Sequence, residues 1–240
     1  MSNRFEGKIV VVAGGTGGLG RAVSLAFLGE GAHVVVTYRN KTEFSALQTE
    51  AAAKAQSLEG YALDVTNDAD TAQFVKSLTD SGKKIGALVN AVGAYAGGTP
   101  LWRTEPEVFD QMLSLNLRSG YILARAIAPQ MVKQGFGAIV NVASRSAFDH
   151  AAGAAAYAAS KAAAVAMFDS FAADLTGSGV RSNSILPSII DTEANRKAMP
   201  NADFSKWPKP DEIARVILFL CSDDAKLVHG ASVPVYGANA

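Results

Sequence analysis

The stretch Val12-Ala-Gly-Gly-Thr-Gly-Gly-Leu-Gly-Arg21 decides the fold of this chain. It follows an apolar run typical of a buried parallel strand, and it opens a segment with helical periodicity. Glycines at such a turn let backbone N–H groups approach a phosphate, and the N-terminus of the helix adds a favourable dipole. The spacing Gly14-x-x-x-Gly18-x-Gly20 differs from the commoner dinucleotide fingerprint, and no Gly-Lys-Ser/Thr follows, as a kinase-type phosphate loop would require. The stretch predicts a dinucleotide-binding turn.

Outward from this turn, short β-branched runs alternate with longer helical segments. Seven runs are predicted as strands, at 9–12, 34–36, 61–63, 87–89, 138–142, 181–186 and 231–236. Helices are predicted between them, at about 18–29, 41–57, 68–80, 107–134, 154–177 and 210–221. This alternation is typical of the α/β class, and it predicts a single-domain Rossmann fold over residues 1–240, a doubly wound seven-stranded parallel sheet with helices on both faces.

Within this domain we expect a cofactor half, about 1–135, and a catalytic and substrate half, about 136–240. The segment 188–210 is rich in Pro, Asn and Asp and follows the carboxyl end of a strand, where such sheets bind ligands. We predict that it forms a lid over the site; the alternative is a plain connection.

Composition excludes several other classes. The 22 Lys and Arg balance 22 Asp and Glu, so the chain lacks the basic field of a nucleic-acid-binding protein. Residues 151–168 are mostly alanine, but Lys161 at their centre would be costly in a membrane, so we expect a buried helix and no membrane partner. No secretory signal opens the sequence, which predicts a cytoplasmic protein. The histidines His33, His150 and His229 are scattered, and we expect no metal site.

The sequence Tyr157-Ala-Ala-Ser-Lys161 carries the predicted chemistry. A four-residue step on a helix places both side chains on one face, one turn apart. A free phenol has a pKa of about 10, and a nearby ammonium group would lower it toward the range where the phenol exchanges protons. We therefore predict that Tyr157 is a general acid and base and that Lys161 activates it.

Two further polar residues fit the same chemistry. Ser144 follows a predicted strand, where its hydroxyl could polarise a substrate carbonyl, and Ser146 is a second candidate for that role. Asn116 lies inside a predicted helix, an unfavourable position for asparagine that calls for a local reason.

These motifs together resemble the classical short-chain dehydrogenase/reductase family over nearly the whole chain. The glycine spacing resembles its Thr-Gly-x-x-x-Gly-x-Gly motif, with Ala13 in place of threonine. Residues 90–93 resemble its Asn-Asn-Ala-Gly and 187–192 its Pro-Gly-x-x-x-Thr, with Ala91 and Ser188 as departures. The resemblance implies a catalytic set of Ser144, Tyr157, Lys161 and Asn116; in the family, the asparagine holds a local distortion and a water in a proton relay to the lysine. The alternative for Asn116 is a simple packing hydrogen bond.

The resemblance also implies a cofactor site and an assembly. Cofactor contacts are expected from the phosphate loop, the strand ends and the catalytic pair: Gly14, Thr16, Gly17, Gly18, Leu19, Gly20, Tyr38, Arg39, Asp64, Val65, Asn90, Ala91, Gly93, Tyr157, Lys161, Pro187, Ile189 and Thr192. Because helices corresponding to 107–134 and 154–177 form a four-helix interface in the family, a homo-oligomer is expected, a tetramer or a dimer.

The end of the second strand indicates which cofactor is used. An acidic residue there would bind the adenosine ribose, whereas arginine accommodates a 2′-phosphate. The chain has Tyr38 and Arg39, with Lys41 nearby, so we predict a preference for NADP(H), with NAD(H) as the alternative. Asp64 resembles the adenine-contacting aspartate of the family; its other interpretation is a cap for the helix starting near Asn67.

The substrate is less well determined. We expect a small-molecule carbonyl or alcohol, interconverted by hydride transfer. An aromatic pocket from Tyr95, Trp102, Phe204 and Trp207 would suit a flat ring, but the same side chains could simply pack the lid. Because residues 193–207 are similar to the dihydropteridine reductase branch, a reductase of a pterin or quinonoid ring is one alternative. A dinucleotide-binding sensor without catalysis is another.

Overall fold

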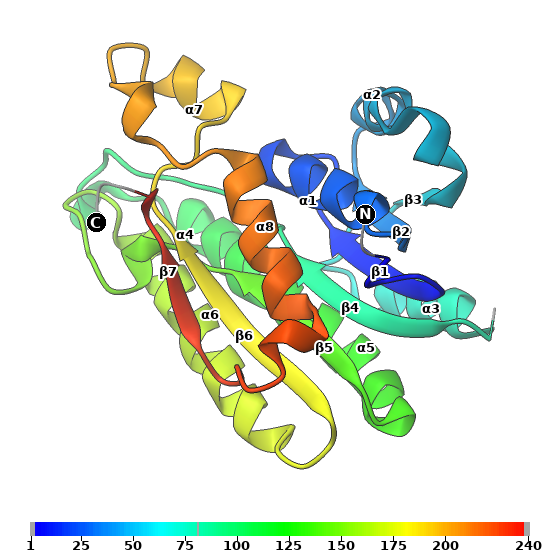
Figure 1. The fold of residues 1–240 in the computed structure, drawn as a ribbon. Coiled ribbons are helices and arrows are strands. Elements are labelled where there is room, and N and C mark those ends of the chain that lie inside the picture. Colours follow the sequence, from blue (N-terminus) through cyan, green and yellow to red (C-terminus); the bar gives the residue numbers. More distant parts are fainter. Residues whose placement is uncertain (1–2, 81, 238–240) are drawn as a thin grey trace.

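A computed structural model describes residues 3–80 and 82–237 and contains one sheet of seven parallel strands (Figure 1). The spatial order is β3-β2-β1-β4-β5-β6-β7. The strands are β1 (Lys8–Ala13), β2 (His33–Tyr38), β3 (Leu58–Ala62), β4 (Lys84–Asn90), β5 (Gly137–Val142), β6 (Val180–Pro187) and β7 (Ser232–Val235). The order reverses beside β1, which places the β1 and β4 ends at the switch point where such sheets bind ligands.

Helices cover both faces of the sheet, as the sequence predicted. They are α1 (Gly18–Gly29), α2 (Lys41–Ala51), α3 (Asp68–Asp80), α4 (Pro106–Leu113), α5 (Ser119–Gln134), α6 (Ala155–Asp174), α7 (Glu193–Ala198) and α8 (Pro210–Cys221). Successive side chains of a strand point to opposite faces of the sheet, so the residues of β1 contribute alternately to the cores on its two sides. Val10 and Val12 join a core with α1 and α8, whereas Ile9 and Val11 join a core with α3 and α5. No helix in the described ranges is long and apolar enough to cross a membrane.

Two predicted helices differ from the structure. The helix expected at 41–57 ends at Ala51, because Ala52 has a φ of 48° in the left-handed region, and 3₁₀ turns over Ala52–Ser57 lead into β3. The helix expected at 107–134 is divided into α4, a π-helical turn at Ser114–Arg118 and α5. Asn116 lies in that turn, so the distortion that the family resemblance implied for this residue is present.

The remaining boundaries move by a few residues. β3 begins three residues before the predicted 61–63, and α6 is shorter at both ends than the predicted 154–177. The segment 188–210 contains α7 and a 3₁₀ turn at Phe204–Lys206. In Figure 1 this segment lies beyond the C-terminal end of β6. The site described below lies at the same edge of the sheet.

Candidate active site

The glycine-rich loop after β1 is shaped by close backbone approaches. Gly14 adopts a φ of 70°, a conformation that glycine accepts without strain. A Cβ on Gly20 would stand 2.0 Å from the carbonyl oxygen of Gly14, and one on Gly18 would stand 2.7 Å from Cγ2 of Thr192. Only glycine at these two positions lets α1 begin tightly against the loop and against the 188–210 segment. The loop therefore fits the phosphate-binding role predicted for it.

A cavity of about 260 Å³ opens from this loop toward the ends of β2 and β4. Nine of the residues predicted to bind the cofactor line it: Gly14, Thr16, Gly17, Tyr38, Arg39, Asp64, Val65, Ala91 and Gly93. The cavity is polar on its β2 side, and its position at the switch point suits the adenosine and phosphate part of a dinucleotide. The residues present therefore fit a dinucleotide cofactor.

Other predicted cofactor residues lie outside this cavity and have structural contacts. Leu19 is buried in the core and Gly20 packs against the loop, while Pro187 ends β6 and Ile189 follows it, half exposed. The buried Asn90 donates from Nδ2 to Oδ1 of Asn141 on β5 at 3.0 Å and accepts from the backbone of Val92 at 3.3 Å. It holds the loop that carries Ala91 and Gly93.

The hydroxyl of Thr192 accepts a hydrogen bond from the Asn195 backbone at 3.2 Å and so caps α7. Asp64 does not cap α3: its Oδ1 accepts from the backbone of Thr66 at 2.9 Å and from the Thr66 hydroxyl at 2.7 Å. Asn67, immediately before α3, accepts instead from the Asp70 backbone at 3.2 Å. The capping interpretation of Asp64 was therefore wrong, and these bonds lower the pKa of its carboxyl group, with a smaller contribution from the charge of Arg39.

Tyr157 and Lys161 lie one turn apart on α6, and each is tied to the end of β5. Lys161 is only 4% exposed, and its Nζ donates to the carbonyl oxygen of Val142 at 2.9 Å. Tyr157 is hydrogen-bonded to Ser144, the second residue after β5. The two α6 residues and the strand-end serine that the sequence predicted as catalytic therefore belong to one cluster.

Asn116 connects the π-helical turn to this cluster. Its Oδ1 accepts from the Ala94 backbone at 2.9 Å, and its Nδ2 donates to the Ala94 carbonyl oxygen and to Oγ of Ser160, both at 3.0 Å. Ser160 in turn donates to the carbonyl oxygen of Tyr157 at 2.7 Å. A Cβ on Gly93 would stand 2.9 Å from Oδ1 of Asn116 and 3.2 Å from Nζ of Lys161, so both groups lie against this glycine.

Burial controls both titrating groups. It raises the pKa of the Tyr157 phenol, an effect that the hydrogen bond with Ser144 partly offsets and that the neighbouring Tyr95 strengthens. Burial lowers the pKa of Lys161 to about 8, so its amine still carries a proton at neutral pH. The sequence predicted that Lys161 would lower the pKa of Tyr157. In the chain alone the pKa of the phenol moves the other way, because spacing reveals the neighbouring ammonium group but not the desolvation.

Tyr95 is the predicted substrate residue that contacts Tyr157. Its ring packs edge-on against Tyr157 with centroids 4.9 Å apart, although Tyr95 is 68% exposed. The half-buried Ser146 donates its backbone N–H to Oγ of Ser144 at 3.1 Å and so fixes the orientation of that hydroxyl. Ser146 thereby acts on Ser144 through its backbone.

The other predicted aromatic residues do not join Tyr95. Phe204 and Trp207 contact each other with centroids 5.0 Å apart, and Arg196 lies 4.9 Å over the Phe204 ring. Trp102 is 83% exposed. These contacts favour the alternative in which Phe204 and Trp207 pack the 188–210 segment.

Sequence reasoning missed several residues of the cavity. Thr37 accepts the Gly14 backbone N–H on its hydroxyl at 3.2 Å, and Glu43 in the first turn of α2 accepts from the Thr16 hydroxyl at 3.0 Å. Asn40, Leu63, Val92 and Leu115 also line the cavity. Their only sequence signal is that most of them adjoin a strand end, which does not separate them from ordinary loop residues. Among the described residues, no cluster of three or more His, Cys, Asp or Glu side chains suits a metal ion.

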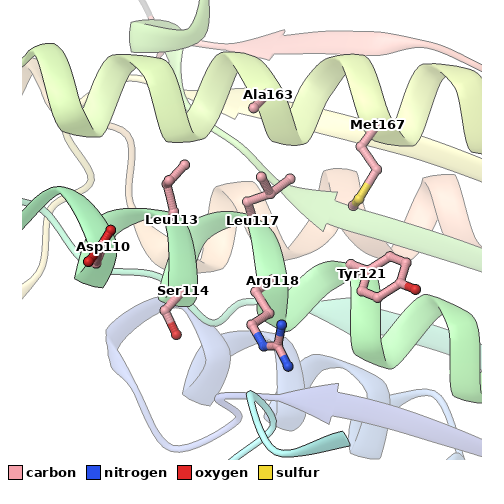
Figure 2. A pocket seen from close by; sticks show the side chains of 8 residues that line it. All are labelled: Asp110, Leu113, Ser114, Leu117, Arg118, Tyr121, Ala163 and Met167. Atoms are coloured by element: carbon pink, nitrogen blue, oxygen red, sulfur yellow. The ribbon is translucent and has the colours of Figure 1, made fainter.

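A larger cavity, about 560 Å³, lies elsewhere, between the π-helical turn and α6. Figure 2 shows Leu113 and Leu117 pointing toward α6, and Met167 of α6 pointing back toward them. Asp110 and Arg118 are at its polar margin. Its helices are those for which the sequence predicted contacts between copies of the chain.

Known proteins match this sequence and fold. The model of the short chain dehydrogenase family matches residues 8–203. The chain is 31% identical over 242 residues to the 3-oxoacyl-(acyl-carrier-protein) reductase FabG of Thermotoga maritima, and the match covers 98% of each chain. A NAD+-bound xylitol dehydrogenase shares 25% identity and a TM-score of 0.90 over 98% of this chain and all of the other. ElxO with NADP bound has a TM-score of 0.90 over 96% of this chain and 97% of its own, but at 24% identity it supports the fold alone.

The predicted family resemblance is confirmed by these matches. The names of these relatives are those of dehydrogenases and reductases, so an enzyme is favoured over the sensor hypothesis. The similarity of residues 193–207 to the dihydropteridine reductase branch gains no support from them.

Proposed function

The chain belongs to the short-chain dehydrogenase family of oxidoreductases, and we propose that it interconverts a carbonyl and an alcohol with NADP(H) as the preferred cofactor. The observation that carries this proposal is the attachment of both Tyr157 and Lys161 to the end of β5, beside the loop that holds Gly93. A proton-transferring phenol and a buried cation therefore lie at the edge of the sheet where the cofactor cavity opens.

The cofactor, when bound, supplies or accepts the hydride. Tyr157 carries the proton: its raised pKa keeps the phenol protonated at neutral pH, ready to donate to the oxygen of a carbonyl substrate. In the alcohol direction the phenolate would accept the proton, so that direction gains rate as the pH rises. Ser144 donates a second hydrogen bond to the same substrate oxygen. The charge of Lys161 favours the phenolate, and its bond to Val142 fixes its position.

Asn116 acts as a positioning residue in this proposal. Its side-chain amide joins the Ala94 backbone to Ser160, which holds the turn of α6 that carries Tyr157. The π-helical turn orients the side chain of Asn116 toward Ala94 and Ser160. The proposed water relay to Lys161 would start from this side chain. The 188–210 segment, in turn, is proposed as a lid, with α7 held to the phosphate loop by the contact of Thr192 with Gly18.

Preference for NADP(H) is supported by Arg39. Its exposed guanidinium lines the cavity at the β2 end, where an adenosine 2′-phosphate would lie, and within the described ranges it forms no ion pair. Neither of its neighbours at the strand tip, Tyr38 and Asn40, carries the acid that would bind a ribose hydroxyl. We also propose that copies of the chain associate through the face shown in Figure 2.

The function is tested with NADPH and NADH over a panel of ketones, aldehydes and oxidised pterins. We expect oxidation of NADPH with carbonyl substrates; turnover with pterins alone would indicate the ring-reductase alternative. Arg39→Asp should weaken NADPH binding roughly tenfold or more while sparing NADH. Equal losses for both cofactors would contradict the 2′-phosphate role of Arg39.

A further inference from the structure

The adenosine end of the cofactor cavity contains charges of both signs. Arg39, Glu43 and Asp64 all line it. Asp64 lies within electrostatic reach of Arg39, whose positive charge contributes to its lowered pKa after the hydrogen bonds from Thr66. One guanidinium therefore shares the cavity with two carboxylates. Arg39 alone suggests a strongly basic 2′-phosphate site, but its charge is compensated.

Glu43 is held over the phosphate loop. The Thr16 hydroxyl donates to its Oε2 at 3.0 Å, which joins the first turn of α2 to the loop between β1 and α1. The start of α2 is itself fixed, because Asn40 caps it by accepting the Thr42 backbone N–H at 2.9 Å. The carboxylate is therefore held by Thr16 on a helix whose start is itself fixed, and it lines the same cavity as Arg39.

Resting on the proposed function, we propose that Glu43 is a second determinant of cofactor choice and opposes Arg39. A 2′-phosphate at this end would bring a second anion beside the carboxylate, and like charges at short range repel. An unphosphorylated ribose brings no such charge. Glu43 thus reduces the advantage that Arg39 gives to NADP(H) and keeps NAD(H) usable by the same site.

The substitution Glu43→Gln isolates this effect. Glutamine keeps an oxygen that can accept from the Thr16 hydroxyl, so the connection between α2 and the loop is retained while the charge is removed. The matched control is Glu50→Gln, which removes the same charge from the same helix. Glu50 pairs with Arg21 and is outside the cavity.

The measurement is calorimetric binding of two fragments without the nicotinamide, adenosine 2′,5′-bisphosphate and 5′-AMP, to the purified full chain. In Glu43→Gln we expect the bisphosphate to bind roughly two- to fivefold more tightly and AMP to bind unchanged. Glu50→Gln should leave both affinities unchanged. The gain should shrink in high salt, because the repulsion is screened at this exposed site.

A third variant, Arg39→Gln, separates this proposal from the function on which it rests. If Arg39→Gln weakens the bisphosphate and Glu43→Gln alters neither ligand, Glu43 has no role in cofactor choice and the proposal fails while the NADP(H) preference stands. If Arg39→Gln leaves the bisphosphate unaffected, the proposed 2′-phosphate site itself is wrong. An equal change of both ligands in Glu43→Gln would indicate a structural role through Thr16 and would also overturn the proposal.

Discussion

The proposed catalytic cluster and the proposed adenosine end of the cavity are built differently. Around Tyr157 and Lys161, polar groups are buried and each is fixed by hydrogen bonds to a strand end or to Asn116. At the adenosine end, Arg39 is exposed and its neighbours are charged side chains on loops and on the first turn of α2. Desolvation controls the first region, whereas a screened balance of charges controls the second. Substitutions should therefore have large effects in the cluster and small, salt-dependent effects at the other end.

The largest effect is expected from Tyr157→Phe. Removing the hydroxyl removes the proposed proton donor, and we expect kcat to fall by about 10²- to 10⁴-fold with the best substrate. The ring contact with Tyr95 remains, so the thermal midpoint and the dissociation constant of the cofactor should be close to those of the wild type. Steady-state kinetics, calorimetry and thermal unfolding measure the three quantities. Undiminished turnover would remove Tyr157 from the chemistry.

Lys161→Met should reduce kcat roughly 100-fold without loss of stability. The lowered pKa of Lys161, about 8 against 10.5, corresponds to roughly 3 kcal/mol of free energy that opposes folding at neutral pH. Methionine removes that cost, although it also loses the bond to the Val142 carbonyl. The thermal midpoint of the variant should therefore equal or exceed that of the wild type at pH 7.

The same substitution gives a pH test with a definite sign. Between about pH 8 and pH 10.5 the unfolded chain keeps the Lys161 proton and the folded chain has released it. The unfolding free energy of the wild type should thus rise relative to Lys161→Met across that interval, as measured by urea unfolding at several pH values. A constant difference between the two proteins would mean that the folded pKa of Lys161 is not lowered.

The sequence predicted the sheet, the glycine-rich loop and the Tyr157/Lys161 pair. The spacing of Gly14, Gly18 and Gly20 and the four-residue step from Tyr157 to Lys161 are local patterns, and such patterns reflect helix geometry and backbone contacts directly. The β-branched runs predicted the sheet because its strands are buried on both faces. The glycine-rich loop and the Tyr157/Lys161 pair could therefore be predicted, because local backbone geometry fixes the positions of these residues.

What the sequence did not predict depends on tertiary contacts. Local periodicity predicted one continuous helix through the π-helical turn, and only the family resemblance implied a distortion at Asn116. The raised pKa of Tyr157 results from burial that spacing does not reveal. Glu43 reaches the cavity only because α2 folds back toward the loop that carries Thr16. The predicted aromatic substrate pocket did not form for the same reason, because Phe204 and Trp207 pack against each other.

Tyr95→Ala tests a residue that shares features of both regions, because Tyr95 is exposed like the adenosine end yet contacts the buried phenol of Tyr157. Losing the edge-on ring contact should lower kcat/KM roughly two- to tenfold. Because Tyr95 contributes to the raised pKa of Tyr157, the pH profile of alcohol oxidation should move to lower pH. Tyr95→Phe keeps the ring contact but removes the hydroxyl, so it should retain the rate and still show the shifted pH profile. A variant with a reduced rate and an unmoved profile would limit Tyr95 to substrate contact.

The smallest effect is expected at the adenosine end, from Asp64→Asn. The charge of Asp64 strengthens its bonds with Thr66, and its lowered pKa means that this stabilisation is present above the unfolded pKa of about 4 and is lost as the pH falls. The group is largely exposed, so we expect the affinities for NADPH and NADH to change only about two- to threefold. Because the substitution also removes a negative charge near Arg39, NADPH should gain relative to NADH. A 100-fold loss of affinity for both cofactors would show that the contact of Asp64 with Thr66 dominates binding at this end. The expected contrast between small effects here and large effects around Tyr157 would then be wrong.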